Sequence, residues 1–191
     1  PNYLTSVVGS NVFYYDSGTG LVTYGPTGGG VLPVGTTYGQ YIIFNGLAWV
    51  VASLTGNNSP LGTNSLESNT TGISNTAVGS AVLSDNIYGD SNTGLGYLAL
   101  TVNTTGSNNT AVGVSALTAN ISGKNSVALG FESLKTNTLG QANTALGTYA
   151  LNSSVTISQL VAVGFEALKA NTVGTFNTAV GYQSLLANTT G

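Results

Sequence analysis

Residues 106–120 read Gly-Ser-Asn-Asn-Thr-Ala-Val-Gly-Val-Ser-Ala-Leu-Thr-Ala-Asn, and variants of this stretch recur every 17 residues through eight units that fill residues 56–191. One glycine column, here called the turn glycines, keeps this spacing without a gap: Gly62, Gly79, Gly96, Gly113, Gly130, Gly147, Gly164 and Gly181. A leucine column does the same: Leu66, Leu83, Leu100, Leu117, Leu134, Leu151, Leu168 and Leu185. A fixed period of this size is typical of a solenoid.

A second glycine column, here called the corner glycines, consists of Gly72, Gly89, Gly106, Gly123, Gly140, Gly174 and Gly191. It is interrupted once, at Ile157. The unit around Ile157 keeps its length, although Ser154 and Leu160 stand where two asparagine columns would continue. The length of a unit is therefore constrained more tightly than the residue types at its corners. A stack of coils requires this, because every coil must match the next.

Each unit has two apolar stretches separated by polar, glycine-rich corners. The second centres on the leucine column, and the first on a Val/Leu column: Leu61, Val78, Leu95, Val112, Leu129, Leu146, Val163 and Val180. Neither stretch is long enough for an ordinary helix, and glycine and β-branched residues disfavour one. We therefore predict an all-β fold, a parallel β-solenoid of eight 17-residue repeats over residues 55–191, with coils about 4.8 Å apart and a total length of roughly 38 Å.

In such a stack, like packs on like. The Val/Leu and leucine columns predict continuous apolar ribs, and two asparagine columns, which include Asn86 and Asn92, predict amide ladders. The glycines mark positions that need a positive φ or have no room for a Cβ. An alanine column that includes Ala111 predicts a surface that another surface can approach closely. A mixed rib of Thr63, Ser80, Tyr97, Val114, Phe131, Thr148, Phe165 and Tyr182 lies beside the turn glycines. Apolar ribs on both faces of a strand predict burial between chains, and we expect three parallel copies on a common axis.

Residues 1–54 lack the period and hold most of the aromatic residues. Val12–Tyr15 with Leu21–Tyr24, and Tyr41–Phe44 with Leu47–Val51, predict two hairpins. The second pair is linked by Asn45-Gly46, which favours a two-residue type I′ turn. We predict a β-hairpin-rich cap or connector.

Composition excludes several classes of function. Only 5% of the residues are charged and the net charge is -3, against about 25% charged in an average protein. The 3 Lys and Arg residues cannot neutralise the roughly six to ten phosphates that a DNA-binding protein contacts, so we expect no nucleic-acid partner. The chain has no apolar run long enough for membrane insertion. Without Cys or His most metal sites and catalytic triads are lost; we expect no cofactor, no metal and no enzyme. Pro1 and the end at Gly191 indicate a processed product or an excerpt.

One short motif carries a family resemblance. Asn125-Ser126-Val127-Ala128-Leu129-Gly130 resembles the Asn-Ser-Val-Ala-Ile-Gly motif of trimeric autotransporter adhesin heads, and other units carry Asn-Thr-Ala-Val-Gly. Full units such as residues 177–191 resemble repeats in phage and large-virus tail-fibre or spike proteins. The resemblance implies a left-handed parallel β-roll with three chains side by side, used as a stiff fibre or adhesive head. The period is longer than is usual in autotransporter heads, and the chain shows no heptad stalk or membrane anchor, so the viral-fibre side fits better.

The sequence therefore predicts a structural, adhesive fibre segment, homotrimeric, on a virion surface or otherwise extracellular, with a surface glycan or protein as its candidate receptor. Two alternatives stay open. One is a bacterial adhesin head that binds matrix or glycan. The other is a polysaccharide-degrading tailspike.

Candidate chemistry rests on a few acidic residues. Glu132 and Glu166 share a column two units apart, about 9.6 Å if the coils stack, at the edge of the carboxyl separation of inverting glycosidases. Lys135 and Lys169, three residues after each glutamate, favour surface ion pairs instead. Asp85 and Asp90 flank one corner and are candidates for a calcium site.

Overall fold

The computed structural model describes residues 56–190 continuously, together with six N-terminal strand segments at residues 7–8, 11–16, 21–25, 31–32, 41–44 and 49–52. The chain divides into two compact units, Pro1–Leu54 and Thr55–Gly191. All regular secondary structure in the described residues is β, which confirms the predicted fold class. The described part of the chain holds no helix long and apolar enough to cross a membrane.

The N-terminal unit contains two antiparallel sheets. The first has the order β1-β2-β3-β4, with β1 at Val7–Val8, β2 at Asn11–Asp16, β3 at Leu21–Gly25 and β4 at Val31–Leu32. The second pairs β5 (Tyr41–Phe44) with β6 (Trp49–Ala52). Both predicted pairs of strands are present, with Phe44 paired to Trp49 in the second. The predicted turn at Asn45-Gly46, and the predicted strand residues Leu47 and Ala48, lie outside the described residues.

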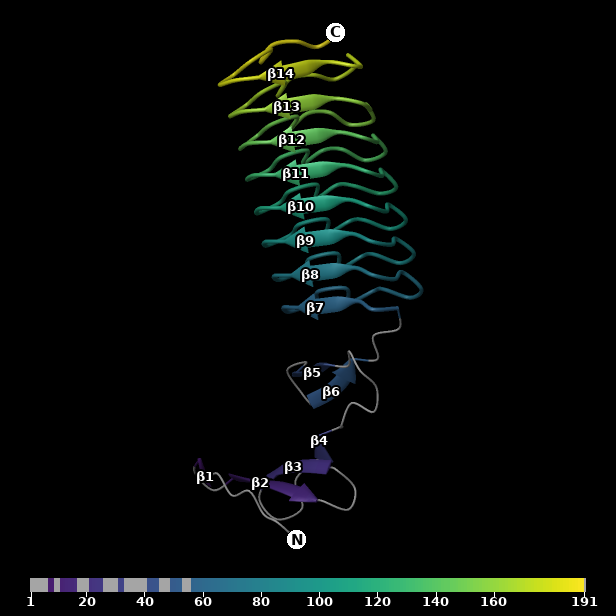
Figure 1. The fold of residues 1–191 in the computed structure, drawn as a ribbon, viewed down its shortest axis with the longest axis vertical. Helices are drawn as coiled ribbons and strands as arrows, with labels where there is room; N and C mark the ends of the chain where they lie inside the picture. The colour runs from purple at the N-terminus through teal and green to yellow at the C-terminus, as the bar shows by residue number, and fades with distance from the viewer. Residues whose placement is uncertain are drawn as a thin grey trace. The chain divides into compact units, whose positions relative to one another are not determined.

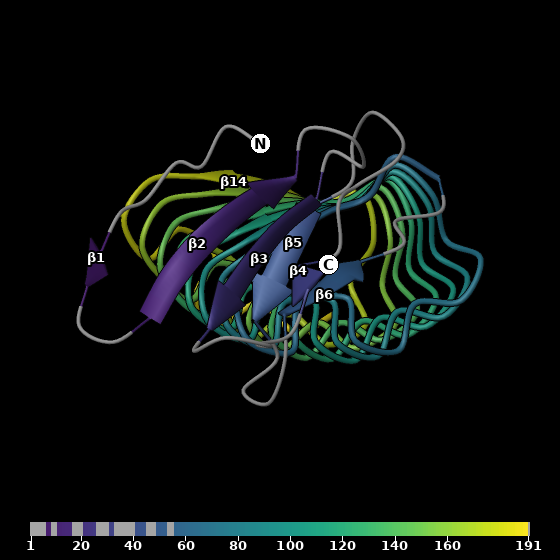
Figure 2. The ribbon, with the colours of Figure 1, turned by 90° about the horizontal axis from the view of Figure 1, so that it is seen from below.

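The second unit is a parallel β-solenoid with one short strand in each coil (Figure 1). The strands are β7 (Ser59–Leu61), β8 (Thr76–Val78), β9 (Thr93–Leu95), β10 (Thr110–Val112), β11 (Val127–Leu129), β12 (Thr144–Leu146), β13 (Val161–Val163) and β14 (Thr178–Val180). Each residue pairs with its equivalent in the next coil, as Ala111 does with Ala128. The coils follow one another with only a small progressive offset when viewed along the stack (Figure 2). The predicted eight-coil parallel solenoid is therefore confirmed.

The structure reverses the predicted roles of two columns. The middle residue of each strand points into the coil, so alanines such as Ala111 and Ala128 are fully buried. The flanking residues alternate to the outside, and 46% of Leu129 and 69% of Val180 are exposed. The prediction that the alanine column offers an approach surface and that the Val/Leu column forms an internal rib is wrong. The reason is the narrow interior, where the side chains that precede the leucines, such as Val82 and Ala99, leave room for little more than a methyl group in the alanine column.

One pair of substitutions shows how narrow that interior is. Ala99 and Ala116 occupy the buried position that precedes the leucine in their coils, where an earlier coil has Val82. The strand position that contacts Val82 is Gly94, and a Cβ added there would lie 2.4 Å from Cγ1 of Val82. The larger side chain in one coil is thus accommodated by the loss of a methyl group in the next.

The leucine column occupies an unusual backbone conformation. All eight leucines have positive φ, for example 51° at Leu117, which costs a non-glycine residue about 1–2 kcal/mol. Burial offsets this cost, because the side chains of Leu83 through Leu168 in this column are fully buried. The backbone N–H of Leu117 also donates to Ser133 O in the next coil at 3.0 Å, while Ser115 N donates to Tyr97 O in the preceding coil at 2.9 Å. The turn is therefore held from both sides.

The turn glycines meet two demands at once. Gly113 has φ 135°, and a Cβ there would lie 2.5 Å from the carbonyl oxygen of Gly130 in the next coil. Any side chain would force neighbouring coils apart at the position where the strand enters the turn.

Two asparagine ladders run through the other side of the interior, as predicted. Asn103 Nδ2 donates to Asn86 Oδ1 in the preceding coil at 2.6 Å and to Gly106 O at 3.0 Å. Asn92 Nδ2, from the second ladder, donates to the same Gly106 carbonyl at 2.8 Å. A Cβ on Gly106 would lie 2.3 Å from Asn103 Oδ1, so the corner glycines are required for space and not for a positive φ.

The coil that contains β13 interrupts this arrangement. Ser154 stands in the ladder, and its hydroxyl donates to Asn171 O at 3.0 Å. Asn137 Oδ1, buried in the coil below, has no partner among the described residues. Ile157 and Leu160 are buried in the positions of a corner glycine and an asparagine. The shorter Ser154 side chain makes room for the Ile157 Cβ, so the two substitutions depend on each other.

We expect Gly113→Ala to destabilise the solenoid by at least about 2 kcal/mol, because the alanine is strained at this φ and clashes with the Gly130 carbonyl. Urea denaturation followed by circular dichroism measures the change. Thr105→Ala, at an exposed position of the preceding corner, is the control and should shift the free energy of unfolding by less than about 0.5 kcal/mol. Equal effects of the two variants would contradict this account of the turn.

A double-mutant cycle tests the dependence between Ser154 and Ile157. Ser154→Asn alone should destabilise, because the amide meets the Ile157 Cβ, and Ile157→Gly alone should destabilise by leaving a cavity. The double variant restores the ladder and gives Asn137 Oδ1 a donor. We expect a favourable coupling of about 1–3 kcal/mol between the two changes. Strictly additive free energies would show that the two positions are independent.

Candidate functional site

The turn that follows each strand carries the only ion pairs among the described residues of the solenoid. Lys135 Nζ lies 2.8 Å from Glu132 Oε1, and Lys169 pairs with Glu166 in the equivalent turn two coils further on. Glu132 and Glu166 both have positive φ. These turns place acid and base three residues apart on the same side of the coil.

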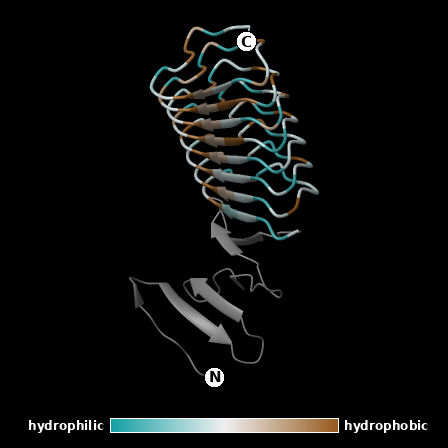
Figure 3. Ribbon diagram, turned by 45° about the horizontal axis from the view of Figure 1, so that its top comes forward, coloured by the Kyte–Doolittle hydropathy of each residue, from teal (hydrophilic) through white to brown (hydrophobic). Residues whose placement is uncertain are grey.

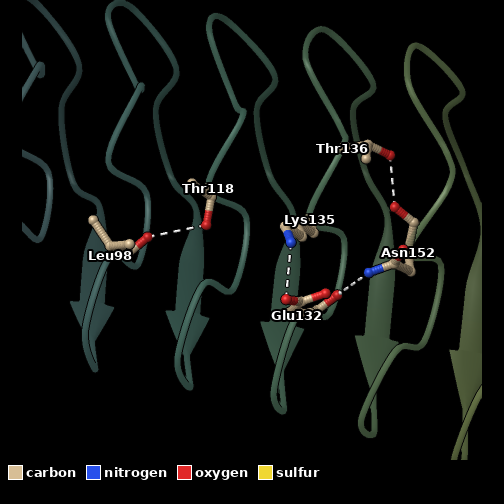
Figure 4. Close-up of polar contacts among 6 residues, drawn as sticks. All are labelled: Leu98, Thr118, Glu132, Lys135, Thr136 and Asn152. Atoms are coloured by element: carbon tan, nitrogen blue, oxygen red, sulfur yellow. Dashed lines mark hydrogen bonds and ion pairs between the residues drawn. The ribbon is translucent and has the colours of Figure 1, made fainter.

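Lys135 and Lys169 belong to one column, called here the lysine column, which also contains Thr118 and Asn152. In several coils without lysine, side chains of this column form hydrogen bonds to backbone carbonyls of the preceding coil (Figure 4). Thr118 Oγ1 donates to Leu98 O at 3.1 Å, and Asn152 Nδ2 donates to Glu132 O at 2.9 Å. In both cases a short polar side chain satisfies the carbonyl of a positive-φ residue in the preceding coil. Lys135 and Lys169 replace these caps, so an ion pair takes the place of a capping bond in two coils.

Four aromatic rings form a continuous row beside the ion pairs. Phe131 and Tyr149 meet edge to face with centroids 5.4 Å apart, and Tyr149 and Phe165 do so at 6.4 Å. Phe165 and Tyr182 are stacked at 5.4 Å. The mixed rib has Thr148 between the two phenylalanines, and Tyr149 from the neighbouring column fills this gap. Lys169 Nζ lies 4.7 Å from the Tyr149 ring centroid, a cation–π contact.

Sequence reasoning found the phenylalanines and both ion pairs but missed Tyr149. A tyrosine one position out of register gives no column signal, because the other residues of its own column have no common character. The Phe-Glu-x-Leu-Lys pattern, present at residues 131–135 and again at 165–169, indicated where the candidate site lies. It did not indicate that the Tyr149 ring lies between the two phenylalanines.

The electrostatics argue against an acid–base pair. Hydrogen bonds from Lys169 and then from Gln183 lower the pKa of Glu166 below its ordinary value of 4.5. A general acid needs the opposite shift. Glu132 and Glu166 are each paired with a lysine of their own turn, and the coil with Tyr149 and Asn152 lies between them. The environment of Glu166 therefore does not favour the general-acid role that a polysaccharide-degrading tailspike would require of it.

The two aspartates considered for calcium both accept hydrogen bonds from the chain itself. Asp90 Oδ1 accepts from Ile73 N at 2.8 Å, and Asp85 Oδ1 accepts from Ser84 Oγ at 3.1 Å. Within residues 56–190, no three acidic, histidine or cysteine side chains gather in a way that would hold a metal ion.

These features define a β-solenoid repeat protein whose turn glycines and leucine column shape every coil. No family model matches the chain, and neither a curated protein nor a solved structure matches it. The resemblance to adhesin heads and tail fibres therefore rests on the repeat motif and stays a prediction.

The Glu166 interactions predict a pH dependence. Because the pKa is lowered in the folded chain, the stabilisation is fully present above about pH 4.5 and is lost as the pH falls through the folded-state pKa. We expect Glu166→Gln to lower Tm slightly at neutral pH, and the difference from wild type to shrink in acid. Glu67→Gln, an exposed acid with no ion pair among the described residues, is the control. A Tm difference that is independent of pH would contradict the assigned role.

Proposed function

We propose that the chain is a structural segment of an extracellular or virion-surface fibre that assembles as a parallel homotrimer. The observation that carries the proposal is the outward face of strands β7–β14, here called the sheet face. It consists of the Val/Leu column and of the Thr/Val column two residues before it.

The sheet face combines a fully apolar column with a column of mostly threonine. More than 40% of Leu61, Leu95 and Leu129 is exposed, and neither column contains a charged residue. Contiguous apolar surfaces of this kind mark association sites in soluble proteins. The interior of the coil is already filled by the alanine and leucine columns, so the sheet face has no partner within its own solenoid.

The charged residues of the solenoid lie elsewhere on the coil. Glu67, Asp85, Asp90, Lys124, Glu132, Lys135, Glu166 and Lys169 all belong to turns and corners. Hydropathy colours range from pale teal to brown along the strands, and the strongest teal lies on the loops, which also carry brown segments (Figure 3). Exposed apolar side chains also occur at the corners, for example Tyr88 and Val173, but only the sheet face combines an apolar column with a complete lack of charge. This lack of charge favours a bundle of parallel chains with their sheet faces inward.

The mechanical role follows from the ladders. Backbone hydrogen bonds and asparagine amides join every coil to the next, so bending the stack would break several bonds at once. Repetition gives such a segment length and stiffness. The adhesive role, with a surface glycan or protein as receptor, is supported by the resemblance to fibre and adhesin repeats.

Light scattering coupled to size-exclusion chromatography tests the assembly, and we expect the mass of three chains. Leu129→Asp places a charge on the sheet face and should give folded monomers. Val102→Asp is the matched control, because Val102 is 38% exposed but lies in a column that also contains Asp85. It should leave the mass unchanged. A wild-type chain that is folded and monomeric at micromolar concentration would overturn the proposal.

A further inference from the structure

We infer that the affinity between the chains is concentrated in coils β11–β14, where an anchor patch of Val127, Phe131, Val161, Phe165 and Tyr182 binds second copies of the same chain. The inference rests on the proposed homotrimer and says which part of the solenoid holds it together.

The outward surface of coils β11 and β13 differs from that of the other coils. These two present Val127 and Val161 at the first outward position of the strand, whereas the other six present a serine or a threonine, such as Thr110 and Thr144. Phenylalanines follow in the same two coils, at positions 131 and 165, where β8 has Ser80. Replacement of hydroxyls by larger apolar groups therefore coincides in two columns and in the same coils.

The rings of the patch pack on neighbouring rings of the same chain before any partner binds. Phe131 rests on Tyr149 and Phe165 on Tyr182, yet 41% of Phe131 and 39% of Phe165 remain exposed. Rings packed in this way lose little conformational entropy on association. Aromatic side chains with this combination of packing and exposure are the residue types that dominate interface energetics.

The charges beside the patch favour a second copy over other partners. Glu132 with Lys135 and Glu166 with Lys169 give equal numbers of both signs along its border. A border of this kind is complementary to itself, while an acidic or a basic partner would meet repulsion from one member of each pair. It also reproduces the common anatomy of an interface, with an apolar centre and a polar rim.

Alanine variants of the full chain locate the affinity. Phe131→Ala and Phe165→Ala should each weaken the trimer by at least about 10-fold, as measured by sedimentation over a dilution series. Tyr97→Ala is the matched control, because Tyr97 belongs to the same column in coil β9 and is 54% exposed. It should change the dissociation constant by less than about threefold. Circular dichroism checks that the coils remain folded.

Photo-cross-linking provides a readout that a purely intrachain role of the rings would not move. Benzoylphenylalanine in place of Phe131 should give interchain adducts with peptides of coils β11–β14, and in place of Tyr97 far fewer. Equal yields at the two positions, or no interchain adduct at 131 in a trimeric sample, would overturn the inference and leave the trimer standing. A monomeric wild type would overturn both. Adducts from added glycan or host protein, without interchain adducts, would assign the patch to another partner.

Discussion

The constant height of the coil is the constraint on which the rest of this structure depends. Each coil forms hydrogen bonds with the coils above and below it through its strand, its turn and its corner, so all three must return to the same level after the same number of residues. The turn glycines and the positive-φ leucines follow from this demand. The glycines let neighbouring carbonyls approach, and the leucines turn the backbone while filling the space that the turn encloses.

A coil this small cannot build its interior from large apolar groups alone. One side holds alanine methyls and leucine side chains, and the other holds asparagine amides, most of whose donors and acceptors are satisfied along the stack; Asn137 Oδ1 and Asn177 Nδ2 are the exceptions among the described residues. Corner carbonyls such as that of Gly106 accept from both ladders, so polar groups are buried with few left unpaired. The side chains of the Val/Leu column are placed on the outside, where they create the sheet face.

The period, the strands and the amide ladders could be predicted because each corresponds to a column of identical or similar residues in the sequence. The inward and outward sides of the strand could not, since in Thr110-Ala111-Val112 either the small or the large residue could face the core. The space opposite Ala111 determines which side of the strand faces the core, and this space cannot be read from any single column of the sequence. Tyr149, the positive φ of the leucines and the link between Ser154 and Ile157 were hidden for a related reason: each depends on contacts between columns. The candidate site was visible only as a duplicated motif.

Contacts between columns have a consequence for how such chains change length. Val82 with Gly94, and Ser154 with Ile157, show that a coil unlike its neighbours carries its compensation across a boundary. Whole coils that resemble one another, such as those of β10 and β11, are interchangeable units that duplication or deletion can add or remove without disturbing the stack. The coil that contains Ile157 and Leu160 is not interchangeable in this way, because its removal would place a different residue next to Asn137. Growth of the array by whole coils is therefore easier in some segments than in others.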